Sequence, residues 1–213
     1  MRLKKIPSAG AYIASYPELA IVDGKALKGK WQTLFPTQQP LHVEIGMGKG
    51  GFIHGMASQN PDINYVGIEL YDSVLMRALE KLVKEPLPNL RLLLVDAREL
   101  TEVFAAGEVG QVYLNFSDPW PKTRHAKRRL THEGFLDIYK AILPKHGHVQ
   151  LKTDNQSLFE YSLMSFNAYG MTFSDVCVDL HANPERYPHN VMTEYEQKFH
   201  KKGQPIYLVG ANF

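Results

Sequence analysis

Apolar positions along this chain follow two different spacings, which alternate from residue 41 onward. Short apolar or alternating runs predict strands over 41–45, 64–69, 90–95, 111–115, 148–153, 172–180 and 206–209. Apolar residues spaced three and four apart predict helices over 52–57, 74–83, 135–143, 158–166 and 193–202. Strands that alternate with helices indicate a mostly parallel sheet, so the pattern predicts an α/β fold with helices on both faces of the sheet.

The first 40 residues follow neither spacing. Regular structure there is interrupted by four prolines, at Pro7, Pro17, Pro36 and Pro40. The total length of 213 residues suits one α/β domain. We therefore expect an N-terminal extension over 1–40 and a single domain over 41–213.

Several function classes are excluded by what the chain lacks. No apolar run is long enough to span a bilayer, and the basic first residues lack the apolar segment of a secretory signal. Cys177 is the only cysteine, so an internal disulfide and a Cys-rich metal site are excluded. The nine histidines show no metal-ligand spacing. These features predict a cytoplasmic protein without a membrane segment or a metal.

Positive charge is concentrated in two short segments. The chain has 24 basic and 22 acidic residues, but eight of the basic ones lie at the N-terminus or within 122–129. The remaining chain therefore holds 16 basic residues against the same 22 acidic ones. The eight are Arg2, Lys4, Lys5, Lys122, Arg124, Lys127, Arg128 and Arg129. This distribution favours a polyanionic partner bound at one place, although a solvated charged loop would have the same composition.

Glycines follow the first predicted strand, in the sequence GMGKGG at 46–51. Glycine lets the backbone turn tightly and lets a ligand approach it closely, as in nucleotide-binding loops. The spacing of Gly46, Gly48 and Gly51 also satisfies the dinucleotide fingerprint. A plain strand-to-helix turn without a ligand remains open from this segment alone.

Three carboxylates at the predicted strand ends help to choose the ligand. Glu69 ends the second strand, where a carboxylate can accept hydrogen bonds from both ribose hydroxyls. Asp96 ends the third strand, where it could accept from an adenine amino group. Glu44 lies just before the glycines, where it would repel a pyrophosphate and attract a cation. Together they favour S-adenosylmethionine, which carries an ammonium and a sulfonium, over a dinucleotide.

The most distinctive segment follows the fourth predicted strand and reads NFSDPWPK at 115–122. Pro119 and Pro121 restrict the backbone and hold the shape of this loop. A preordered loop beside a methyl donor is suited to holding an acceptor base, on which Trp120 could stack. Two structural alternatives stay open: Trp120 covers the edge of the core, and Asp118 closes an Asx-turn.

Five segments give the chain a close resemblance to bacterial tRNA (guanine-N7-)-methyltransferases, from about residue 28 to residue 207. The matching segments are EIGMGKG at 44–50 with GIE at 67–69, NFSDPWPK at 115–122, RH and KRRLT between 124 and 131, KTDN at 152–155, and TEYE at 193–196. The segment around Asp118 is specific to that family, whereas the glycine loop is shared by many methyltransferases.

The resemblance implies a Rossmann-like class I methyltransferase fold, with a seven-stranded sheet whose last strand is antiparallel. It implies that S-adenosylmethionine is held by Glu44, Gly46, Gly48, Glu69, Asp96 and Asp118, with Asp118 also the catalytic residue. It implies that the substrate is held by Lys122, Arg124, His125, Lys127, Arg128, Arg129, Asp154, Thr193 and Glu196. The implied reaction is methylation of N7 of a guanine in the tRNA variable loop, by a monomer or a homodimer.

Some of these residues also have a purely structural interpretation. Thr193 and Glu196 have the spacing of a helix capping box. Asp154 follows a predicted strand and suits either a helix N-cap or a contact to a base. Three other functions remain open at this stage: methylation of an exocyclic amine, hydride transfer with a nicotinamide, and RNA binding without catalysis.

Overall fold

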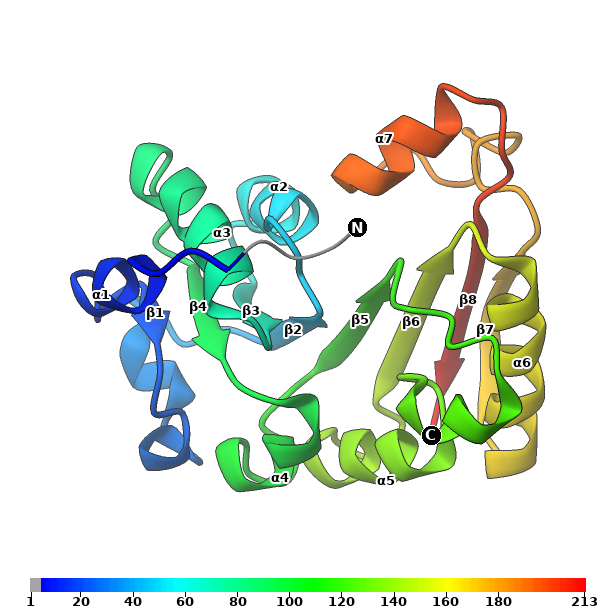
Figure 1. The fold of residues 1–213 in the computed structure, drawn as a ribbon. Helices are drawn as coiled ribbons and strands as arrows, with labels where there is room; N and C mark the ends of the chain where they lie inside the picture. The colour runs from blue at the N-terminus through cyan, green and yellow to red at the C-terminus, as the bar shows by residue number, and fades with distance from the viewer. Residues whose placement is uncertain (1–4) are drawn as a thin grey trace.

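The computed structural model describes residues 5–213, which form one twisted sheet of eight strands flanked by helices (Figure 1). The strand order is β1-β4-β3-β2-β5-β6-β8-β7. The strands are β1 (Ala20–Ile21), β2 (Leu41–Ile45), β3 (Asn64–Glu69), β4 (Leu90–Leu94), β5 (Gln111–Asn115), β6 (His148–Thr153), β7 (Thr172–Cys177) and β8 (Tyr207–Asn212). β8 runs antiparallel to both β6 and β7, which confirms the predicted antiparallel last strand.

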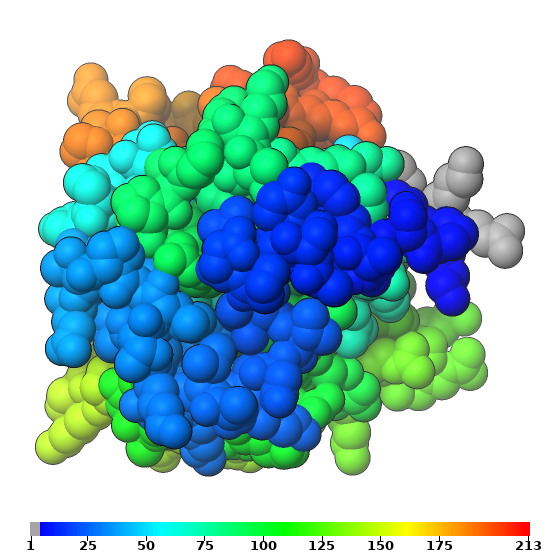
Figure 2. Space-filling view, turned by 90° about the vertical axis from the view of Figure 1, so that its left-hand side faces the viewer, coloured from blue at the N-terminus to red at the C-terminus, as the bar shows by residue number. Residues whose placement is uncertain are grey.

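The predicted count of seven strands is wrong by one. The extra strand, β1, pairs in parallel with β4 through only two residues. A strand of that length carries no detectable periodicity, so the sequence could not reveal it. Figure 1 shows β1 beside β4, and in Figure 2 the N-terminal segment (blue) covers much of the face turned to the viewer. Trp31 and Phe35 of the same segment are buried in the main core. The boundary at residue 40 stays a prediction.

Seven α-helices occur in the described residues. They are α1 (Ala9–Ala14), α2 (Gly51–Gln59), α3 (Asp72–Lys84), α4 (Leu100–Val103), α5 (Glu133–Ile142), α6 (Gln156–Tyr169) and α7 (Glu194–His200). Five of them confirm the predicted helices, with ends shifted by a few residues. Helices α1 and α4 were not predicted because each is too short to show a full apolar stripe. None of the helices in residues 5–213 is long and apolar enough to cross a membrane.

The two faces of the sheet differ in chemistry. Helices α4, α5 and α6 cover a face lined by aliphatic side chains such as Val43, Val112 and Leu151. On the opposite face, strand register aligns Asn115 of β5 with Lys152 of β6. Side chains alternate along a strand, so Glu44 of β2 lies on this same face. The polar residues are therefore gathered on the face where α2 packs.

The chain reverses its direction of travel across the sheet between β2 and β5. Strands β2, β3 and β4 succeed one another toward one edge, and β5 and β6 lie on the other side of β2. Ligands in such sheets bind beyond the carboxyl ends of the strands at this reversal. Helix α7 lies at the same end of the molecule, beside α2 (Figure 1). The fold thus places the candidate site between β2, β5, α2 and α7.

Candidate active site

The glycine loop between β2 and α2 requires glycine for its backbone conformation. Gly46, Gly48 and Gly50 have φ angles of 73°, 60° and 75°, in the left-handed region that other residues rarely adopt. A Cβ atom added at Gly46 or Gly48 would meet nothing within 4 Å. Both positions therefore border open space, where a ligand can approach the backbone closely.

Glu69, at the end of β3, is tied to the glycine loop. Its Oε2 accepts from the Gly48 N–H at 3.2 Å, and its Oε1 accepts from the Leu70 and Tyr71 N–H groups at 2.8 and 3.2 Å. Burial raises the pKa of Glu69, while these N–H donors oppose the change. Oε1 thus already accepts two N–H groups, so the free acceptor position of Glu69 is on Oε2. Its contact with the ribose hydroxyls stays a prediction.

Glu44 and Asn115 form a buried pair with unused acceptors. The Asn115 side-chain amide donates to Glu44 Oε1 at 2.8 Å. Glu44 Oε2 and Asn115 Oδ1 are both buried and have no hydrogen-bond partner among the described residues. Both oxygens belong to side chains that this hydrogen bond joins. Two buried acceptors without a donor are a site for an N–H-bearing cation.

Glu44 has no counter-charge of its own in this buried region. Glu44 is 1% exposed, and burial raises its pKa to about 8. Lys152 is the nearest buried cation, but its Nζ is 2.7 Å from Glu196 Oε2. Lys152 therefore opposes the pKa rise of Glu44 without cancelling it, and Glu194 adds to the rise. An incoming cation would compensate Glu44 in a region with low dielectric screening.

Asp96, predicted to accept from adenine, is already engaged. Its side chain pairs with the Arg98 guanidinium, and its Oδ1 accepts from the Arg98 N–H at 2.9 Å. Hydrogen bonding to Arg98 lowers the pKa of Asp96 below its usual range. Asp96 stays ionised and must share its carboxylate with Arg98 if it binds the donor.

The loop after β5 has a strained backbone around Asp118. Phe116 and Trp120 have φ angles of 51° and 42°, in a region that costs a non-glycine residue of order 1 kcal/mol or more. Pro119 restricts the loop between them. The Asp118 side chain is exposed, and no hydrogen bond to it occurs within residues 5–213. The Asx-turn alternative therefore has no support, and the carboxylate points to solvent in a rigid loop.

The basic segment contains side chains with two different environments. Arg129 is half-buried: its guanidinium donates to the carbonyls of Pro119 and Trp120 at 3.1 and 2.9 Å and lies over Tyr161 of α6. Arg128 is exposed and lies over the Trp120 ring at 4.8 Å. The other predicted RNA contacts lie at or near the surface of the same loop, at Lys122, Arg124, His125 and Lys127. Arg129 thus holds the acceptor loop, and the others face outward.

The remaining predicted substrate residues, Asp154, Thr193 and Glu196, differ in their burial and in their hydrogen bonds. Asn155, rather than Asp154, is the N-cap of α6, and its side chain accepts from the Leu158 N–H. Asp154 is half-buried beside it. Thr193 caps α7 by accepting from the Glu196 N–H at 2.9 Å. The Glu196 side chain does not complete the capping box, because it is fully buried against Lys152. Direct contact of these residues with substrate stays a prediction.

Two residues of this site were not singled out from the sequence. A lysine inside an apolar strand, as at Lys152, is a sign of a paired buried charge. Asn115 offered no such sign, because its role depends on Glu44 being on the neighbouring strand. No group of three or more metal-ligating side chains was found in the part of the chain that the structure describes.

Comparison with known proteins shows the family of this chain. A family model described as "Putative methyltransferase" matches residues 38–209. Two curated proteins, from Streptococcus pyogenes serotype M5 (strain Manfredo) and serotype M49 (strain NZ131), are named tRNA (guanine-N(7)-)-methyltransferase. Each is 54% identical to this chain over 213 residues, which is 100% of both chains.

Solved structures share the fold at low sequence identity. A 16S rRNA methyltransferase, KamB, superposes with a TM-score of 0.65 at 15% identity, covering 87% of this chain and 93% of that one. An antibiotic-related methyltransferase gives 0.61 at 17% identity, covering 84% and 89%. These likenesses show the class I methyltransferase fold. With the full-length identity to the streptococcal proteins and the matching family model, they show that this chain belongs to the tRNA (guanine-N(7)-)-methyltransferase family.

Proposed function

We propose that this protein transfers a methyl group from S-adenosylmethionine to N7 of a guanine in the variable loop of tRNA. The observation that carries the donor assignment is the buried pair of free acceptors, Glu44 Oε2 and Asn115 Oδ1. They fit the α-ammonium of a cationic donor, and they would repel a pyrophosphate at the same place. The nicotinamide alternative therefore loses its support.

The donor supplies a methyl group on a sulfonium. Glu44 and Asn115 would hold its ammonium, Glu69 its ribose, and the open backbone at Gly46 and Gly48 would let it approach. Asp96 stays a predicted contact to the adenine. These contacts do not take part in the chemistry; they align the donor, and alignment can lower a barrier by roughly 7–11 kcal/mol in favourable cases.

The acceptor needs orientation more than activation. Guanine N7 has a lone pair and no proton at neutral pH, so its attack on the methyl carbon requires no general base. Positive charge moves from sulfur to the purine as the new bond forms and the old one breaks. Asp118, exposed on its rigid loop, would accept N–H groups of the guanine and stabilise the cationic purine electrostatically.

Nucleoside analysis tests this proposal directly. Unmodified tRNA transcripts would be incubated with the enzyme and labelled donor, digested, and examined by mass spectrometry for a nucleoside with a fixed positive charge. A matched transcript with 7-deazaguanosine at the target position has CH in place of N7 and is expected to take up no methyl group. A methylated exocyclic amine, or label on the 7-deaza transcript, would favour the alternative amine methyltransferase.

Donor binding is expected to release a proton near neutral pH. Glu44 has a pKa of about 8 without the donor, so it is mostly protonated at pH 7, and a bound cation favours its ionised form. Because only about one tenth of the protein has Glu44 ionised at pH 7, the observed donor affinity is about tenfold lower than the affinity of the form with ionised Glu44. Affinity should rise from about pH 6 to about pH 8. Calorimetry in buffers with different ionisation enthalpies measures both effects, and equal heats in all buffers would contradict them.

The two environments in the basic segment predict two different phenotypes. The variant K127A/R128A removes exposed charges and should reduce the salt dependence of tRNA binding by about one log unit per residue. R129A should instead lower the turnover rate at saturating tRNA, because Arg129 supports the loop that carries Asp118. Filter binding over a salt series, with turnover at saturation, separates them. Equal effects of both variants on the salt slope would argue against this division.

A cytoplasmic location, and the choice between monomer and homodimer, stay predictions. The tRNA substrate supports the first of them. Sedimentation of the purified chain measures the second.

A further inference from the structure

Lys152 is a fully buried lysine in a central strand, and it has no role in the chemistry proposed above. Its Nζ donates to Glu196 Oε2 at 2.7 Å, to the Val191 carbonyl at 2.8 Å and to Asn190 Oδ1 at 3.0 Å. All three hydrogen bonds of the ammonium thus go to the segment from 190 to 196. Burial lowers the pKa of Lys152, and Glu196 opposes that change.

Glu196 is held as completely as Lys152. It is 0% exposed, its Oε1 accepts from the Asn190 amide at 2.7 Å, and His181 Nε2 lies 3.2 Å from the same oxygen. No part of its carboxylate reaches the surface. The expected substrate contact of Glu196 would require this side chain to leave these partners. Lys152 would then be a buried charge without a counter-charge, which is strongly destabilising.

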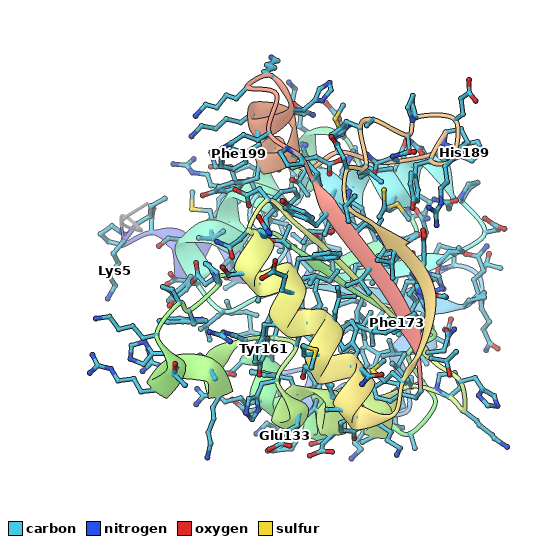
Figure 3. The ribbon with its side chains drawn as sticks, turned by 90° about the vertical axis from the view of Figure 1, so that its right-hand side faces the viewer. Lys5, Glu133, Tyr161, Phe173, His189 and Phe199 are labelled. Carbon is cyan, nitrogen blue, oxygen red and sulfur yellow. The ribbon has the colours of Figure 1, made fainter. Side chains whose placement is uncertain are left out.

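The anchored segment lies against the glycine-loop helix. A Cβ atom at Gly55 of α2 would be 2.6 Å from Val191 Cγ1, and one at Gly51 would be 2.5 Å from the Glu194 side chain. Glycine at these two positions therefore allows the segment to pack directly on α2. Figure 3 shows Phe199 of α7 and His189 of the preceding loop at the same end of the molecule, where β8 begins.

Beside its contacts with α2, part of the segment borders a cavity. The loop before α7 covers a cavity of about 270 Å³, whose lining includes Phe52, Gln150, His189 and Val191. A segment that spans a cavity is positioned by its few specific contacts. Lys152 supplies three of these from the sheet, and its positive charge acts on the nearby Glu44.

We propose that Lys152 is a positioning residue that, through Glu196 and the Val191 carbonyl, fixes the segment 190–196 over α2 so that the exposed Tyr195 is presented to the tRNA guanine. This proposal rests on the proposed methyl transfer. It assigns Glu196 to the interior of the protein and leaves the substrate-facing role to the exposed residues of α7.

The test compares K152M with G55A. K152M removes the anchor, and G55A places a methyl group where Val191 packs while favouring the helix of α2. Both variants should lower kcat/KM for tRNA about 100-fold, because a displacement near 1 Å is enough for such a loss. Both should speed amide hydrogen exchange between residues 190 and 200. Binding of 5′-methylthioadenosine, which lacks the amino-acid part of the donor, should change less than threefold in both.

A double variant separates positioning from direct contact. K152M leaves Glu196 buried without a counter-charge, whereas K152M/E196M replaces the ion pair by two apolar side chains of similar size. Activity at least tenfold above K152M in the double variant is expected from a positioning pair. If Glu196 contacts the guanine, the double variant is no better than K152M, and the proposal is overturned.

Exchange and activity together leave no neutral outcome. Faster exchange in residues 190–200 with unchanged activity in G55A would refute the positioning role, as would lost activity with unchanged exchange or no change in either quantity. Wild-type protein that methylates a substrate other than tRNA guanine N7 would refute the proposed function, whatever the variants do. The two failures are therefore distinguishable.

Discussion

The D118A variant is expected to lower the single-turnover rate of methyl transfer by about 100-fold or more at saturating donor and tRNA. Asp118 follows β5 on a loop whose backbone is held by two left-handed residues, Phe116 and Trp120, and by Arg129. The backbone that carries its exposed carboxylate is thereby held in place before any substrate binds. A preordered negative charge needs no reorganisation when the purine becomes cationic.

The measurement is rapid-quench transfer of labelled methyl groups from enzyme-bound donor. D118N is the matched control, because the amide keeps the size and can still accept a hydrogen bond through its oxygen. An intermediate loss in D118N separates the electrostatic part of the effect from the orienting part. Since Asp118 makes no hydrogen bond within the described residues, the melting temperature should hardly change. A full single-turnover rate in D118A would remove this residue from the mechanism.

The second large effect is expected at Glu44. E44Q should weaken donor binding roughly 10–100-fold at about pH 8.5, the cost of a charge-assisted hydrogen bond of about 1.5–3 kcal/mol. Glutamine can still accept from the Asn115 amide, so the variant removes the charge and keeps the packing. It should also abolish the rise in affinity between about pH 6 and about pH 8, because the titrating group is gone.

Calorimetry with two ligands makes this prediction specific to the ammonium. Affinity for S-adenosylhomocysteine, which has the same amino-acid part, should fall in E44Q as it does for the donor. Affinity for 5′-methylthioadenosine should stay within threefold of the wild type. Equal losses for both ligands would indicate collapse of the pocket and would contradict the assigned partner.

The local features of the fold followed from the sequence because their causes are local. The spacing of apolar side chains depends only on whether the backbone repeats every two or every 3.6 residues. The glycine loop was readable for the same reason, since left-handed φ angles at 46, 48 and 50 restrict the residue type at each position. The strand β1 and the helices α1 and α4 were missed because they are too short for either period to develop.

The contacts between side chains that are distant in the sequence depend on the tertiary structure. Arg128 and Arg129 are neighbours in a uniform basic run, yet one faces solvent and the other binds the backbone of its own loop. The pattern of charges along a chain does not contain that difference, because it depends on where Tyr161 of α6 lies.

The sequence by itself determined the α/β architecture, the glycine loop and the family to which the chain belongs. Only the tertiary structure decided that Glu44 meets Asn115, and that Glu196 is buried against Lys152. Those pairs join residues 71 and 44 positions apart. The physical reason is that charge pairing and burial depend on distance in space, which strand order and register set, whereas periodicity and backbone preference act between near neighbours along the chain.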